Sequence, residues 1–140
     1  MYLDRVESSW PLRINLHAGS KVPLYASASG KLFLAHSPKR MRDRLLTSAP
    51  LIGHTRNTLT TLRQLENEFT RIRRTGYSVD NEEYLAGICC LAVPVMNDQD
   101  RVVAAVAVHA PVSRMTVAQA IEYQPALKEA AEQIGQTLDW

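Results

Sequence analysis

GICCLAVPVMNDQDRVVAAVAVHA, residues 87–110, contains the strongest indication of the fold in this sequence. Two apolar runs, 87–96 and 101–110, flank the short polar segment 97–100, which is the pattern of a β-hairpin. Both faces of both runs are apolar. A sheet that is open to water on one side alternates apolar with polar residues, so we expect helices to cover this hairpin on both faces.

Hydrophobic period and capping signals predict the other elements. Ser37 and Pro38 are typical of a helix start, with Ser37 as the cap. Gly76 is expected to end a helix, and Thr116 with Gln119 has the spacing of a capping box. The expected order is strand 2–7, strand 12–17, helix 27–36, helix 38–50, helix 62–75, strand 77–80, strand 87–96, strand 101–110, and a helical segment from 117 onward that breaks or kinks at Pro125. This order predicts an α+β fold with an antiparallel sheet.

The composition limits the class of protein. A length of 140 residues suits one domain spanning 1–140, and 46% hydrophobic with 21% charged residues is ordinary for a globular chain. A net charge of +2 is too small to indicate nucleic-acid binding, and no apolar run is long enough to cross a bilayer. The two cysteines are adjacent and have no others to pair with, so we expect a cytoplasmic protein without a disulfide framework.

A second stretch, VPLYASASGKLFLA at 22–35, places small residues at the expected start of a helix. The first N–H groups of a helix have no partner within it, and small side chains at 27–30 would let an anion approach them. Close packing of the same small residues against a neighbour explains the pattern equally well. On strand 101–110, one face carries Ala105, Ala107 and His109, which fits either a cavity with one polar group or helix packing against the alanines.

Metal binding and catalysis are not expected. Adjacent residues of a strand point to opposite faces, so Cys89 and Cys90 cannot both reach one ion. Glu82 and Glu83 are interpreted as solvated or loop-fixing residues, and no nucleophile stands beside a base. We therefore predict no catalytic residue, no metal site and no cofactor. The basic run at 71–74 is interpreted as a solvated helix end.

Three blocks of this sequence resemble the IclR family of bacterial transcriptional regulators. VPLYASASGKLFLA resembles the family's LPLHATASGKALLA; RTGYSVDNEEYLAGICCLAVPV resembles RGYAVDDEEYEPGVRCVAAPV; and RVVAAVAVHAPVSRMT resembles GRVVAALSVSGPASRLT. The blocks stand in the same order with similar spacing. The resemblance implies the family's C-terminal effector-binding domain, with a GAF-like α+β fold that binds a small carboxylic acid or aromatic metabolite. It further implies a homodimer or tetramer, no membrane contact, and DNA contact only through an N-terminal winged helix-turn-helix that would precede Met1.

The resemblance also implies the site. Carried over by position, the effector's carboxylate would meet the backbone N–H groups of Ala28 and Ser29. The remaining implied residues form two groups. The polar end would consist of Asp80, Cys90, Ala107 and His109, and the apolar walls of Ile14, Val22 and Ile88.

Four positions depart from the family pattern: Tyr25, where histidine is frequent; Cys89, where arginine is frequent; and Ala107 and His109, where serine is frequent. These departures favour a less polar effector, such as an aromatic carboxylate. His109, if protonated, would donate a charge-assisted hydrogen bond to it. Two other functions stay open from the sequence: a small enzyme acting on a carboxylic acid in the same cavity, and an oligomerisation module without a ligand.

Overall fold

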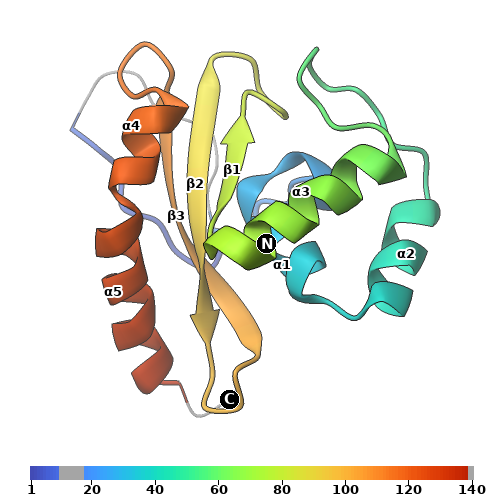
Figure 1. Ribbon diagram of the computed structural model, residues 1–140. Helices are drawn as coiled ribbons and strands as arrows, with labels where there is room; N and C mark the ends of the chain where they lie inside the picture. Colours follow the sequence, from blue (N-terminus) through green and yellow to red (C-terminus); the bar gives the residue numbers. More distant parts are fainter. Residues whose placement is uncertain (10–17, 139–140) are drawn as a thin grey trace.

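A computed structural model describes residues 1–9 and 18–138 of the chain. It confirms the predicted α+β class with an antiparallel sheet (Figure 1). The elements, in chain order, are a short 3-10 helix η1 (Leu24–Ala26), helices α1 (Ala28–His36), α2 (Lys39–Thr47) and α3 (Leu62–Thr75), strands β1 (Ser78–Asn81), β2 (Ile88–Met96) and β3 (Val102–Pro111), and helices α4 (Val117–Glu122) and α5 (Gln124–Gln136).

The sheet has the order β1-β2-β3, with β2 in the centre and both pairings antiparallel. The predicted hairpin is confirmed. β2 and β3 pair from Ile88 with Pro111 to Met96 with Val102, with one register shift near the turn. Asn97 closes that turn, because its N–H donates to the carbonyl oxygen of Arg101 at 2.9 Å.

Helices cover both faces of the sheet, as the apolar hairpin predicts (Figure 1). α1 contacts all three strands on one face, and α3 packs against α1. α4 and α5 contact β2 on the opposite face. Alternate residues of β2 serve the two sides: Cys90 and Ala92 share a buried cluster with Leu32 of α1 and Phe69 of α3. Leu91, by contrast, is buried together with residues of α4.

Local signals in the sequence placed several helix ends correctly. Gly76 ends α3 in the left-handed conformation at φ 80°, and Thr116 with Gln119 forms a complete capping box at α4. The final helical segment breaks before Pro125, which lies in the first turn of α5. One helix start was wrong: Ser37 caps the end of α1, and Pro38 rather than Ser37 precedes α2.

The amino-terminal prediction was partly wrong. Residues 2–7 are not a strand in the structure. Tyr2 makes a ladder-like contact: its N–H donates to the carbonyl oxygen of Ser20 at 3.2 Å, and its own carbonyl oxygen accepts from the N–H of Gly19 at 2.8 Å. The other predicted strand, 12–17, lies outside the described residues.

Candidate functional site

The sheet brings three of the expected polar residues into one row. Asp80 of β1 pairs with Cys90 of β2, and Cys90 pairs with His109 of β3. Directly paired residues project their side chains to the same face of an antiparallel sheet, so the three lie side by side. Cys90 belongs to the buried cluster that includes Ala28 of α1, so this row faces the start of that helix.

The start of α1 has the form that an anion site requires. Ser27 caps the helix: its Oγ accepts from the N–H of Gly30 at 3.1 Å and donates to the carbonyl oxygen of Pro23 at 3.0 Å. Within the described part of the chain, the N–H groups of Ala28 and Ser29 have no hydrogen-bond acceptor. Both therefore point out of the first helical turn as free donors at the positive end of the helix dipole.

Asp80 is a buried carboxylate with 7% of its surface exposed. Its Oδ1 accepts from the N–H of Glu83 at 2.7 Å. Burial raises the pKa of Asp80 from 3.8 to about 6; the hydrogen bond from Glu83 opposes this, and the charge of Glu83 adds to it. The carboxyl of Asp80 therefore titrates only slightly below neutral pH, within the row that is expected to meet the effector.

His109 is held by a residue that the sequence analysis did not single out. The hydroxyl of Tyr2 lies 3.1 Å from Nε2 of His109, and the two rings are 5.9 Å apart. Burial lowers the pKa of His109, so the imidazole is neutral at pH 7 in this structure. The protonated histidine expected from the sequence is therefore disfavoured. Burial, followed by charge interactions with Cys90, Asp80 and Tyr84, raises the pKa of Tyr2 to about 12.

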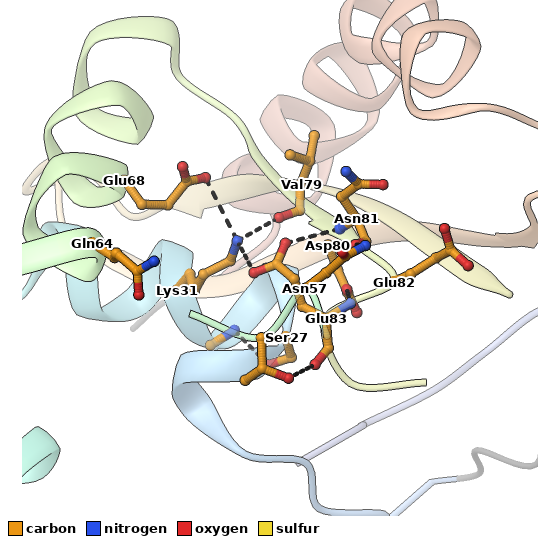
Figure 2. Close-up of polar contacts among 12 residues, drawn as sticks. Ser27, Lys31, Asn57, Gln64, Glu68, Val79, Asp80, Asn81, Glu82 and Glu83 are labelled. Atoms are coloured by element: carbon orange, nitrogen blue, oxygen red, sulfur yellow. Dashed lines mark hydrogen bonds and ion pairs between the residues drawn. The ribbon is translucent and has the colours of Figure 1, made fainter. Parts of the chain in front are cut away.

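A buried lysine of α1 binds β1 and the loop after it through hydrogen bonds (Figure 2). Nζ of Lys31 donates to the carbonyl oxygen of Val79 and to Oε1 of Glu83, each at 2.7 Å, and lies 3.6 Å from Oε1 of Glu68. Lys31 and Glu83 are 1% and 5% exposed. Of the two interpretations given for Glu83, solvated or loop-fixing, the structure supports the second, since its Oε2 also accepts from the N–H of Asn81.

The other expected residues have simpler surroundings. Val22 and Ile88 are half-buried, and Ile88 is the first residue of β2, at the end of the hairpin away from its turn. Ala107 is half-buried and packs against the cluster that includes Ala28. Ile14 lies outside the described residues.

Tyr25 and Cys89, the two remaining departures from the family pattern, each make hydrogen bonds to the backbone. The hydroxyl of Tyr25 accepts from the N–H of Ile52 at 2.8 Å, donates to the carbonyl oxygen of Ile52 and lies 3.2 Å from Nε2 of His54, so it ties η1 to the loop after α2. Cys89 lies on the opposite face from Cys90, where its thiol donates to the carbonyl oxygen of Met115 at 3.1 Å.

Two open hollows lie on other parts of the surface, and neither is lined by an expected site residue. The larger, of about 980 Å³, lies between the end of α3, the β2–β3 turn and α5. The smaller, of about 540 Å³, lies between residues 54–57 and 82–86.

Within residues 1–9 and 18–138, no group of three or more His, Cys, Asp or Glu side chains could hold a metal ion. None of the helices described here is long and apolar enough for a membrane span.

Comparison with known proteins identifies the family. Residues 1–136 match the family described as bacterial transcriptional regulator IclR, C-terminal. The chain belongs to this family. The probable transcriptional regulator SauR of Cupriavidus necator is 44% identical over 137 residues, which are 98% of this chain and 54% of SauR. The chain spans about half the length of the curated IclR-family relatives it matches.

Solved IclR-family structures share the fold. The crystal structure of Thermotoga maritima IclR has a TM-score of 0.87 at 37% identity and covers 96% of this chain and 55% of its own. The inducer-binding domain of Acinetobacter PobR, a double mutant in complex with 3-hydroxybenzoic acid, has a TM-score of 0.84 over 94% of this chain and 79% of its own. At 23% identity, that match shows the fold. The matched IclR-family proteins are regulators of transcription rather than enzymes.

Proposed function

We propose that this IclR-family domain binds a small carboxylic acid between the start of α1 and the sheet, and that binding controls a DNA-binding domain elsewhere in the full-length regulator. The observation that carries the proposal is the pair of free donors at Ala28 and Ser29, opposite the row Asp80, Cys90 and His109. Two adjacent N–H groups at a helix start suit the two oxygens of a carboxylate. The rest of the molecule would lie beside the small, half-buried side chain of Ala107.

An aromatic acid suits this site better than a highly polar one. Alanine and a neutral imidazole stand where two hydroxyls are frequent in the family, so the wall offers one hydrogen-bonding group rather than two. PobR, which shares the fold, is bound to 3-hydroxybenzoic acid. That compound is therefore the first probe. The regulator would act as a dimer or tetramer in the cytoplasm and meet DNA through its remaining part.

Thermal unfolding tests the ligand class. The domain is heated with benzoate, 3-hydroxybenzoate or pyruvate, and with benzamide as the uncharged control. A ligand at a hundred times its Kd stabilises the folded state by about 2.7 kcal/mol. For a domain of this size that raises Tm by roughly 8 °C. The proposal expects such a rise with at least one acid and none with benzamide; equal shifts with benzoate and benzamide would exclude an anion site.

Two variants at the helix start test the role of the amides. Ala28→Pro removes one N–H at the first helical position, where proline is tolerated. Ser27→Ala is the matched control, because it weakens the cap by about 1 kcal/mol but keeps both amides. We expect calorimetry to show at least tenfold weaker binding of 3-hydroxybenzoate by Ala28→Pro and near-normal binding by Ser27→Ala. Unchanged binding by a folded Ala28→Pro protein would refute the amide contact.

A further inference from the structure

Tyr2 connects three parts of the candidate site. Its backbone pairs with Gly19 and Ser20, which lie just before η1 and α1. Its hydroxyl contacts Nε2 of His109, which is 107 residues away in the chain. Burial and, to a lesser extent, electrostatic interaction with Asp80 raise the pKa of its phenol, so the phenol lies close to the polar row of the sheet. Tyr2 therefore belongs to the site through its side chain, although it comes from a segment without regular structure.

The direction of the Tyr2–His109 hydrogen bond follows from the chemistry of the two groups. Both are uncharged at pH 7, because burial raises the pKa of Tyr2 and lowers that of His109. A neutral imidazole has one N–H and one lone pair, and a phenol hydroxyl is a better donor than acceptor. The hydroxyl therefore donates, Nε2 accepts, and the ring proton is left on Nδ1. Among the described residues, nothing accepts a hydrogen bond from Nδ1 of His109.

We propose that Tyr2 is a positioning residue of the effector site, whose hydroxyl holds His109 in the tautomer that donates from Nδ1 to the bound acid. This inference rests on the proposed function above. With this tautomer the histidine does not have to be protonated, since a neutral imidazole with its proton on Nδ1 donates to a carboxylate or to a ring hydroxyl. No proton has to be taken up by the ring when the acid binds.

The first test needs no ligand. Proton–nitrogen NMR correlation spectra of the imidazole distinguish the two neutral tautomers in wild type and in Tyr2→Phe, which keeps the aromatic ring and removes only the hydroxyl. We expect wild type to show the Nδ1–H form, and Tyr2→Phe to show a mixture or the Nε2–H form. An Nε2–H tautomer in wild type, or identical spectra for the two proteins, would overturn the proposal.

The second test measures coupling in binding of 3-hydroxybenzoate. Tyr2→Phe is compared with wild type, and Tyr2→Phe/His109→Ala with His109→Ala. We expect the loss of the hydroxyl to weaken binding about fivefold when His109 is present and not at all when it is absent. Equal losses of affinity with and without His109 would mean that Tyr2 supports the overall structure and does not act through His109. If no acid binds wild type, the proposed function fails and Nδ1 has no ligand, whereas the tautomer result still decides the role of the hydroxyl.

Discussion

Replacing Lys31 by methionine tests how strongly the buried ion pair holds the loop beside the site. Methionine keeps the apolar stem but removes both hydrogen bonds of Nζ, to the carbonyl oxygen of Val79 and to Glu83. Glu83 then stays buried without its cation, and removing one partner of a buried pair costs about 3–5 kcal/mol. That is a large part of the 5–15 kcal/mol that stabilises a typical domain. Urea unfolding followed by circular dichroism measures the loss.

Two further variants separate the buried charge from general effects of the substitution. Lys39→Met breaks an ion pair with Asp43 whose side chains are 71% and 44% exposed, so we expect a loss of at most about 0.5 kcal/mol. Lys31→Met/Glu83→Gln removes the uncompensated charge and should recover at least half of the lost stability. If Lys31→Met costs no more than Lys39→Met, or if the double variant recovers nothing, the buried ion pair does not stabilise the domain in this way.

Three other predictions follow from the same region. Gly30→Ala should destabilise the domain by about 1–3 kcal/mol in urea unfolding, because a Cβ there would lie 2.3 Å from the carbonyl oxygen of Leu24. Gly53→Ala is the control, because a Cβ there would lie no closer than 3.8 Å to another atom. Equal losses of stability in the two variants would contradict the contact with Leu24. The pKa of Asp80 is higher in the folded state than in the unfolded state, so the folded state binds more protons between pH 3.8 and about 6. The free energy of unfolding should therefore fall by up to about 3 kcal/mol as pH rises through that window. Asp80→Asn should flatten this dependence, and an unchanged pH profile would show that another group causes it. Binding of 3-hydroxybenzoate should strengthen as pH falls from 7.5 to about 5.5, because protonated Asp80 no longer repels the carboxylate, and calorimetry of Asp80→Asn should show no such trend.

Local signals predicted much of the fold. Gly76 and Thr116 act within a few residues of themselves, so the sequence alone contains the reason for each helix end. The hairpin was predictable because two apolar runs flank a short polar segment, and its cover by helices was predictable because both faces of the runs are apolar. The polar row was predictable from the family resemblance, and strand register then determines that Asp80, Cys90 and His109 are neighbours.

Contacts between distant segments were not predictable in the same way. Lys31 lies on the buried side of α1, between Ala28 and Ala35, and that position was a signal that it needs a buried partner. The partner is 52 residues away, however, and its identity depends on how the loop after β1 folds. Tyr2 gave no signal at all, because a lone tyrosine in a short alternating segment fits a strand as well as a site.

The most direct measurement of the central claim is an amide proton–nitrogen NMR titration of the domain with 3-hydroxybenzoate. Binding at the start of α1 would shift the amides of Ala28 and Ser29 strongly and in a saturable manner, together with those of residues around Cys90 and His109. If the acid binds but moves instead the amides around Met96 and Gly135, at the larger hollow, while Ala28 and Ser29 stay unchanged, the effector site is elsewhere and the account is wrong.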